Sequence, residues 1–427
     1  MKILTVNRNY FVTGGPEKYM FSLMESMANH QFIPFCVAFK QNRETPYSRY
    51  FVSPPAGDND VYFSDYKMSL FNKIVYACNS IYYFEAKRKL ERLIINERPD
   101  IVLCLNAVFF SDSIIDACRK HNVPIIWRLS DFNKICANYL LYRDGHVCED
   151  CLEHGLARAI RNGCGGYQRS KAAACIKVAG MWLSRVRRLY DHIDFFITPS
   201  AFTRKKLIQG GFDPKKVVHI PTMVKVPACT SLPATQEILF VGRLSHEKGV
   251  ETLLAAFRLL KNNQAWLSIV GDDTTAYAKQ LKESIPDDLR GRITFYGFQN
   301  AEQITMFYDR AFCFVVPSVW YENQPNTVLE GMSHARPAVV SDLGSLCEMV
   351  DDGVTGYRFK AGDTADLAAK LDMLLNNPQQ AQKMGQLARE KVDEVHALDK
   401  HLASMDELFQ LCIDRRKESE AGRAVGR

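Results

Sequence analysis

The sequence predicts an α/β chain built from two doubly wound domains, and three observations lead to this fold class. Short apolar runs typical of buried parallel strands alternate with helical stretches along most of the 427 residues. The first expected strand, at 2–7, is followed by Gly14 and Gly15, as a Rossmann-like first turn requires. The proline-containing stretch 224–235 lies between the two series of strands and is typical of a linker.

The length of the chain allows two domains with cores of their own. We expect a Rossmann-like first domain at 1–222 with a cysteine-bearing insertion at 136–166, a linker at 223–235, a second Rossmann-like domain at 236–394, and a last helix and tail at 395–427. Within the first domain, strands are expected at 2–7, 32–39, 100–106 and 123–129, a loop at 43–66 and one long helix from Ser69 to Glu97. Residues 193–222 close that domain as strand, helix and strand.

Composition and charge are those of an ordinary globular protein, with 47% hydrophobic and 24% charged residues. No apolar run is long enough to span a membrane, and Arg8 interrupts the first strand too soon for a signal peptide. Thirteen cysteines without an export signal indicate free thiols in a cytoplasmic, reducing compartment. The first 205 residues carry 28 Lys and Arg against 19 Asp and Glu, so the first domain is the basic one.

Four cysteines in the insertion have the spacing of a metal site. The series C-x11-C-x2-C-x12-C lies in a glycine-rich loop and consists of Cys136, Cys148, Cys151 and Cys164. Four thiolates with a C-x2-C pair predict a closed, structural zinc site, in which His146 or His154 could replace one ligand. An iron–sulfur cluster fits the ligand type, but no redox motif accompanies it. The alternative is four small thiols without a metal.

Residues 158–188 carry eight Lys and Arg and no acidic residue. Interleaved with apolar residues, this stretch predicts a basic amphipathic helix lying on an anionic membrane surface. The alternative is a helix that packs on the core with a solvated cationic face. A nucleic-acid partner is not expected, because no recognised nucleic-acid module surrounds the stretch.

Two constellations in the second half point to a phosphate-containing ligand. Arg243 follows the strand that ends at Gly242, and Lys248 lies at a helix start, so two cations and helical amides converge. The buried strand 312–318 leads into a loop with Glu322 and then a helix with Glu330. Carboxylates accept from sugar hydroxyls, and the first-turn amides of that helix, near Asn326 and Thr327, form an anion cradle. Gly271 and Phe298 follow neighbouring strands and are expected to border a nucleobase.

The blocks EILFVGRLSHEKGVETLLAAF, PSVWYENQPNTVLEGM and RPAVVSDLGSLCEMVDDGVTGYRF, in this order, resemble the C-terminal half of retaining glycosyltransferases of the family 4 type in the GT-B class. The resemblance implies two Rossmann-like domains that face each other across a cleft, with a last helix that crosses back to the first domain. It assigns Glu322 to the hydroxyls of the donor sugar and Glu330 to those of the ribose. It assigns Arg243, Lys248 and the amides near Asn326 and Thr327 to the phosphates, and it places Gly15 beside them across the cleft.

The first domain departs from the family pattern at one position. Where the family commonly has His-Asp, this chain has Ser130 and Asp131. Serine is neither a general base nor a cation at neutral pH, so the role of the histidine falls to Asp131 or to the backbone, or is absent. Asp131 has a structural alternative, which is to cap the following segment.

The sequence therefore predicts a retaining glycosyltransferase that moves a sugar from a UDP- or GDP-type nucleotide sugar to a hydroxyl acceptor. A catalytic metal is not expected, because no Asp-x-Asp follows the relevant strand and the two cations supply the charge. The basic first domain favours a glycan or lipid-linked acceptor in cell-surface polysaccharide assembly, at the inner face of the plasma membrane. The alternatives are a transferase acting on a small soluble acceptor and a catalytically silent nucleotide-binding subunit, which Ser130 suggests.

Overall fold

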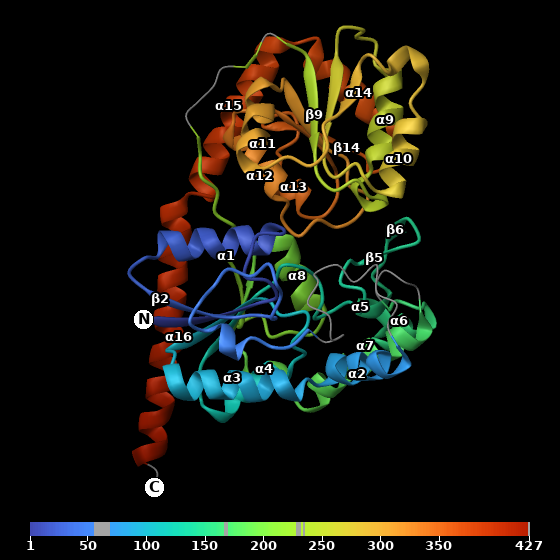
Figure 1. Cartoon of the computed structure of the whole chain (residues 1–427). Helices are drawn as coiled ribbons and strands as arrows, with labels where there is room; N and C mark the ends of the chain where they lie inside the picture. Colours follow the sequence, from blue (N-terminus) through green and yellow to red (C-terminus); the bar gives the residue numbers. More distant parts are fainter. Residues whose placement is uncertain (55–68, 166–169, 228–231, 234, 426–427) are drawn as a thin grey trace.

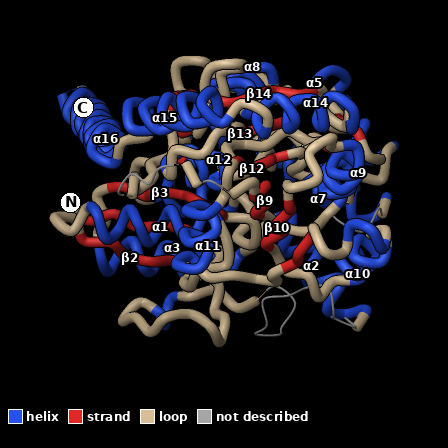
Figure 2. The backbone as a smooth tube through the Cα atoms, turned by 90° about the horizontal axis from the view of Figure 1, so that it is seen from above, coloured by secondary structure: helices blue, strands red, loops and turns tan. Residues whose placement is uncertain are grey.

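The computed structural model describes residues 1–54, 69–165, 170–227, 232–233 and 235–425. It confirms the predicted fold class, because each half of the chain folds around its own six-stranded parallel sheet. In Figure 1 the second domain stands above the first, and the chain crosses between them twice. Figure 2 shows the strands of both sheets lying between helices.

The first sheet has the strand order β2-β1-β3-β4-β7-β8. Its strands are β1 (Lys2–Asn7), β2 (Gln31–Phe35), β3 (Ile101–Asn106), β4 (Ile125–Arg128), β7 (Phe195–Thr198) and β8 (Val217–His219). The helices of this domain are α1 (Gly15–Ser26), α2 (Leu70–Ile81), α3 (Phe84–Glu97), α4 (Ser113–Lys120), α5 (Asp150–His154), α6 (Ala157–Arg161), α7 (Lys171–Val186) and α8 (Ala201–Gln209), with 3-10 turns η1 (Ser48–Tyr50) and η3 (Leu189–His192).

The second sheet has the strand order β11-β10-β9-β12-β13-β14. Its strands are β9 (Glu237–Val241), β10 (Trp266–Val270), β11 (Ile293–Phe295), β12 (Cys313–Val316), β13 (Ala338–Ser341) and β14 (Gly356–Phe359). Around it lie α9 (Val250–Leu259), α10 (Ala276–Glu283), α11 (Ala301–Arg310), α12 (Asn326–Ser333), α13 (Leu346–Met349), α14 (Thr364–Leu375) and α15 (Pro378–Val395), with 3-10 turns η4 (His246–Lys248) and η5 (Asp287–Leu289); α16 (Leu398–Val425) ends the chain.

Each sheet is covered by apolar side chains on both faces, which explains why its strands are continuous apolar runs. All four residues of β12, for example, are buried. In the first domain one core lies under α3 and α4, and the other lies under α1 and α16. In the second domain α9 and α14 cover one face of the sheet, and α11, α12 and α15 cover the other.

The single long helix expected from Ser69 to Glu97 is wrong, since the chain forms two helices, α2 and α3, with a break at Tyr82 and Tyr83. Tyr82 is extended, with φ −153° and ψ 114°. The Tyr82 hydroxyl donates to Asp116 Oδ2 at 2.6 Å and the Tyr83 hydroxyl to the Ser53 carbonyl oxygen at 2.7 Å. These tertiary contacts turn the chain where helical spacing alone would have continued it.

The cysteine-bearing insertion contains a small β-hairpin instead of an irregular loop. Strands β5 (Tyr142–Arg143) and β6 (His146–Val147) pair antiparallel around an Asp-Gly turn, the residue pair that favours tight hairpins. Short helices α5 and α6 follow it. The expected loop at 43–66 falls partly on residues 55–68, outside the described residues.

Helix α16 leaves the second domain and packs along the first (Figure 1). Its side chains Met405, Phe409 and Cys412 join the core under β1 and β3. At the crossing, His401 donates from Nδ1 to the Pro221 carbonyl oxygen at 2.7 Å and accepts at Nε2 from the Tyr19 hydroxyl at 2.9 Å. His396 Nδ1 lies 2.8 Å from the Thr222 carbonyl oxygen, to which it donates. These hydrogen bonds tie both histidines to the backbone that enters the linker.

We expect the crossing to lose stability in mild acid. Burial lowers the pKa of His396 and of His401 from 6.5 to about 4, although each backbone hydrogen bond opposes this shift. At pH values between 4 and 6.5 these histidines bind more protons in the unfolded chain than in the folded one. Their contribution to the free energy of unfolding is therefore fully present above pH 6.5 and falls as the pH drops toward 4. The loss between pH 7 and pH 5 is about 2 kcal/mol per histidine.

Urea unfolding of wild type and a His396→Gln/His401→Gln variant at both pH values measures this loss. The double variant is expected to show a smaller pH dependence, while His246→Gln, whose side chain is 69% exposed, behaves as wild type. Equal pH dependence in wild type and the double variant contradicts the assignment.

Candidate active site

The predicted phosphate-binding cations and the first glutamate lie at the point where the second sheet reverses its strand order. In sequence order the strands are arranged 3-2-1-4-5-6, so β9 and β12 are neighbours whose connections run to opposite sides. Ligands of open parallel sheets bind outside the carboxyl ends of strands at such a point. Arg243 and Lys248 follow β9, and Glu322 follows β12.

The two loops at this point are in direct contact. The Val319 amide donates to the Glu247 carbonyl oxygen at 2.9 Å. Gly249, at φ +68°, starts α9 so close to the other loop that a Cβ there would lie 1.9 Å from the Pro317 carbonyl oxygen. Only glycine fits this position, because both the backbone conformation and the space exclude a side chain.

Glu322 is a buried carboxylate with three donors on one oxygen. Its Oε1 accepts from Lys248 Nζ at 2.7 Å, Ser318 Oγ at 2.6 Å and Trp320 Nε1 at 3.0 Å. Burial alone would raise the pKa of Glu322, but the charge of Lys248 and these hydrogen bonds together lower it. Glu322 is therefore ionised at neutral pH and rigidly oriented.

Arg243 is the more exposed of the two cations. Its side chain is 57% exposed, and its Nη2 lies 3.2 Å from Glu247 Oε1. Lys248, by contrast, is 19% exposed and lies in the ion pair with Glu322. The structure therefore brings Lys248 and Glu322 together, and it holds Arg243 beside them through Glu247.

The start of α12 faces the start of α1 across the two domains. A Cβ on Gly15 would lie 3.4 Å from Asn326 Nδ2, so the glycine loop of the first domain touches the first turn of α12. The first-turn amides of Asn326 and Thr327 open toward this junction. A cavity of about 670 Å³ beside it is lined by residues of both domains, among them Lys18, Asn326 and Glu330.

Glu330 lies one turn into α12 and pairs with the first domain. Its Oε1 is 3.6 Å from Lys18 Nζ. Burial raises the pKa of Glu330, and the Lys18 charge opposes that shift. Glu322 and Glu330 thus occupy different surroundings. Glu322 is buried between the loops that follow β9 and β12, and Glu330 lies at the wall of the cavity.

Gly271 and Phe298 lie at the same edge of the sheet, further from β12. Gly271 follows β10, and a Cβ there would lie 2.1 Å from the Gly242 carbonyl oxygen. Phe298 follows β11, and 79% of it is exposed. An exposed aromatic ring at the carboxyl edge of an open parallel sheet is suited to stacking on a base.

Ser130 and Asp131 make hydrogen bonds to the backbone of their own domain. Ser130 Oγ donates to the Leu105 carbonyl oxygen at 3.1 Å, and Asp131 Oδ1 accepts from the Asn133 amide at 2.9 Å. Burial raises the pKa of Asp131, opposed by that hydrogen bond and by Lys177 and Lys134. The Asp131 carboxylate therefore stabilises a turn, and a contact between it and Glu322 is not among those described.

The structure adds residues that the sequence did not indicate. Asn323 and Gln324, the two residues that follow Glu322, reach the first domain. Asn323 Nδ2 donates to the Leu129 carbonyl oxygen at 3.0 Å, and Gln324 Oε1 accepts from the Thr222 amide at 2.9 Å. The Tyr321 hydroxyl donates to Glu149 Oε1 at 2.7 Å, which links the cysteine insertion to the same loop. These polar residues are ordinary in a loop, so no sequence signal distinguished them.

The four cysteines of the insertion gather around the hairpin without forming a described metal site. Burial, with the charges of the neighbouring cysteines, raises the pKa of Cys136 to about 12 and that of Cys151 to about 11. Among the described residues, no three His, Cys, Asp or Glu side chains are grouped so as to hold a metal ion. The zinc site therefore stays a prediction from the spacing.

Zinc analysis of the purified protein tests that prediction. The spacing predicts one zinc per chain, lost in Cys148→Ser and kept in Cys78→Ser, an exposed cysteine outside the insertion. Elemental analysis measures both. A wild-type protein purified without chelator and free of zinc contradicts the prediction.

We expect Gly249→Ala to destabilise the second domain more than a matched glycine. Gly353 has a similar φ of +74°, but a Cβ there meets nothing within 4 Å, so Gly353→Ala introduces only the left-handed strain. Gly249→Ala adds the clash with Pro317, and chemical unfolding should show an additional loss of about 1–3 kcal/mol. Equal losses in the two variants would contradict the close approach of the loops.

Comparison with known proteins finds a family match in the second half of the chain. Residues 232–391 match the family model described as "Glycosyl transferases group 1". An uncharacterized glycosyltransferase from Methanocaldococcus jannaschii is 34% identical over 142 residues, which is 33% of this chain and 36% of the relative. The amylovoran biosynthesis glycosyltransferase AmsK from Erwinia amylovora is 28% identical over 220 residues, 48% of this chain and 53% of the relative. The chain thus aligns with about a third to a half of these relatives' length.

Solved structures match over nearly the whole chain. Sucrose-phosphate synthase from Thermosynechococcus elongatus has a TM-score of 0.70 at 17% identity, covering 97% of this chain and 99% of that one. The Anabaena protein HepE in complex with UDP and glucose has a TM-score of 0.66 at 15% identity, covering 96% and 99%. Residues 232–391 form a domain of the glycosyl transferases group 1 family, within a chain that has the two-domain GT-B fold.

Proposed function

We propose that this protein transfers a sugar from a nucleotide sugar to a hydroxyl acceptor, with retention of configuration at the sugar carbon. The observation that carries the proposal is the ion pair between Lys248 and the buried Glu322, at the point where the sheet of a group 1 domain reverses its order. That position combines fixed cations, a fixed carboxylate and helical amides, the groups needed to hold a sugar diphosphate.

In the proposed reaction the bond between the sugar carbon and the diphosphate oxygen breaks first. Negative charge develops on that oxygen, where Arg243, Lys248 and the amides of Asn326 and Thr327 stabilise it. Lys248 has three N–H donors, so it can bind a phosphate oxygen and keep Glu322 oriented at once. The acceptor oxygen attacks the same face of the sugar and its proton passes to the departing phosphate oxygen.

Glu322 and Glu330 are assigned to the two sugars of the donor. The three described donors of Glu322 all reach Oε1, and we assign Oε2 to the hydroxyls of the transferred sugar. Glu330, at the wall of the inter-domain cavity, is assigned to the ribose, and Phe298 and Gly271 to the base. The crystal structure of HepE contains UDP and glucose, which supports a UDP-type donor among the nucleotides to test first.

A glycan or lipid-linked acceptor is the class we propose, in the assembly of cell-surface polysaccharide. The relative AmsK is named for amylovoran biosynthesis, and the basic first domain suits an anionic carrier. No helix among the described residues is long and apolar enough to cross a bilayer.

A catalytically silent nucleotide-binding subunit is the second candidate function. It is favoured by Ser130, whose hydroxyl bonds to the Leu105 carbonyl oxygen, and by the turn-forming role of Asp131. Neither residue then supplies the group that the histidine of the resembled family offers. The intact ion pair of Lys248 and Glu322 favours the enzyme.

A donor-binding and turnover experiment separates the two. Thermal shift against a panel of nucleoside diphosphates and nucleotide sugars is expected to find one stabilising base, and Arg243→Ala to weaken that shift. With the matching nucleotide sugar, Glu322→Gln should keep nucleotide binding but lower donor hydrolysis on the order of 100- to 1000-fold. Glu283→Gln, an exposed glutamate of α10, serves as the control.

The outcomes point in different directions. Release of nucleoside diphosphate by wild type, lost in Glu322→Gln and kept in Glu283→Gln, supports the transferase. Nucleotide binding with no turnover of donor, alone or with a mixture of glycan and lipid-linked acceptors, supports the silent subunit.

A further inference from the structure

Helices α2 and α7 of the first domain pack against each other (Figure 1). Both helices expose large apolar side chains. On α2, Leu70 is 76% exposed, Phe71 72% and Ile74 55%. On α7, Trp182 is 61% exposed and Val186 58%. We call these five residues, with the cations Lys73, Lys171 and Arg185 of the same helices, the α2–α7 face. Single exposed apolar residues are common, but five on two adjoining helices are unusual for a soluble surface.

Helix α7 is packed firmly on the first domain along one side, although its other side is exposed. Ala174, Val178 and Met181 of α7 are buried, and Val178 and Met181 pack against the apolar residues of the insertion. At Gly180, α7 meets α2 so closely that a Cβ would lie 3.2 Å from the Ser80 carbonyl oxygen. The exposed residues Cys175, Trp182 and Val186 recur at helical spacing and form one stripe on the other side.

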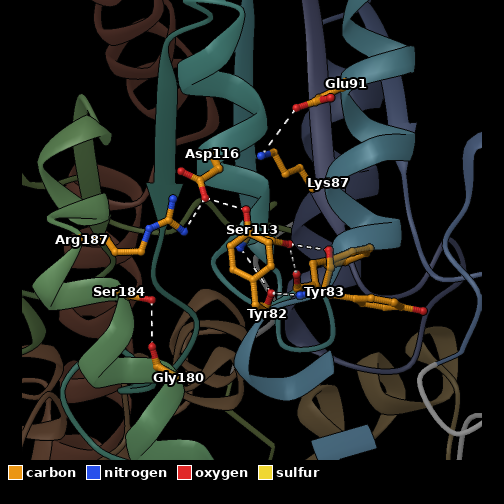
Figure 3. A network of polar contacts seen from close by, with 11 residues as sticks. Tyr82, Tyr83, Lys87, Glu91, Ser113, Asp116, Gly180, Ser184 and Arg187 are labelled. Atoms are coloured by element: carbon orange, nitrogen blue, oxygen red, sulfur yellow. Dashed lines mark hydrogen bonds and ion pairs between the residues drawn. The ribbon is translucent and has the colours of Figure 1, made fainter. Parts of the chain in front are cut away.

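Polar contacts fix the ends of both helices to the domain. Figure 3 shows Arg187, directly after α7, and Tyr82, directly after α2, meeting at Asp116 of α4. Arg187 Nη1 lies 2.7 Å from Asp116 Oδ2, and the Asp116 side chain is only 6% exposed. Ser184 donates to the Gly180 carbonyl oxygen in the same view. The α2–α7 face is therefore carried by two helices that are held to the domain at their ends.

The charge of these helices is all of one sign. Neither α2 nor α7 contains an aspartate or glutamate. Lys73, Lys171 and Arg185 are exposed, while Arg187 is engaged by Asp116 and Arg188 pairs with Asp191. A partner for this surface must therefore offer both apolar groups for the exposed apolar side chains and negative charge for the cations.

We propose that the α2–α7 face binds the surface of an anionic phospholipid bilayer. Trp182, Phe71 and Ile74 enter the headgroup region, where aromatic and aliphatic side chains of interfacial helices are stabilised. Lys73, Lys171 and Arg185 lie against the lipid phosphates, as cations at acidic membranes do. The basic stretch 158–188 supplies only half of this surface, because α2 provides Leu70, Phe71 and Ile74. The proposal does not rest on the transferase activity.

Vesicle sedimentation with the full chain tests the proposal. Wild type is expected to bind phosphatidylglycerol/phosphatidylcholine vesicles at least tenfold more strongly than pure phosphatidylcholine vesicles, and more weakly as salt is raised. Phe71→Ser/Trp182→Ser and Lys73→Glu/Arg185→Glu should each lower the binding at least tenfold. The matched controls are Leu259→Ser/Met373→Ser, which are 54% and 49% exposed on the second domain, and Lys279→Glu/Lys383→Glu, exposed cations of the same domain.

The remaining readouts keep the result interpretable. Each variant should keep the wild-type melting temperature and nucleotide response, so that lost membrane binding is distinguished from misfolding and from failure of the proposed activity. Wild type that ignores anionic vesicles, or controls that lose binding equally, overturns the proposal. If instead analytical ultracentrifugation finds a dimer that Phe71→Ser/Trp182→Ser dissociates, while vesicles are not bound, the face joins two copies of the chain.

Discussion

The second domain depends on the meeting of two loops, at which Lys248 and Glu322 form an ion pair. A buried carboxylate without a partner would be strongly disfavoured, so Glu322 needs Lys248, Ser318 and Trp320 to stay ionised. Lys248 in turn is placed by a backbone that only Gly249 permits. The neighbouring strands β9 and β12 are therefore joined at their ends as well as along their length, and the site is assembled by the same contacts that close the fold.

The loop that carries Glu322 belongs to both domains. Its neighbours Asn323 and Gln324 bond to the backbone of the first domain, and Ser345 Oγ donates to the Glu322 carbonyl oxygen from the second. The orientation of Glu322 is consequently coupled to the position of the first domain. Any opening of the cleft between the domains would have to break the hydrogen bonds of Asn323 and Gln324.

Local patterns predicted the fold class and the edge of the second sheet at which Arg243, Lys248 and Glu322 lie, but tertiary contacts decided the rest. Apolar strands and the residues that follow them, such as Arg243, Lys248 and Glu322, are fixed by the parallel sheet, so the sequence was sufficient to bring them to one edge. The break at Tyr82 comes from a hydrogen bond to Asp116, 34 residues away in the sequence. The helical spacing of apolar residues cannot predict such a distant contact. Asn323 and Gln324 were missed for the same reason, because polar loop residues show their partners only once two domains meet.

The two chain crossings between the domains lie side by side, and this has a mechanical consequence. The Val224 amide donates to the His396 carbonyl oxygen at 3.1 Å, and His396 donates back to Thr222, so the outgoing and returning segments form one hydrogen-bonded pair. A single strand between domains would act as a swivel with three rotational freedoms. Two paired segments resist twisting of one domain against the other and leave bending about one axis. Each closure then brings the two walls of the cleft back into the same relative alignment.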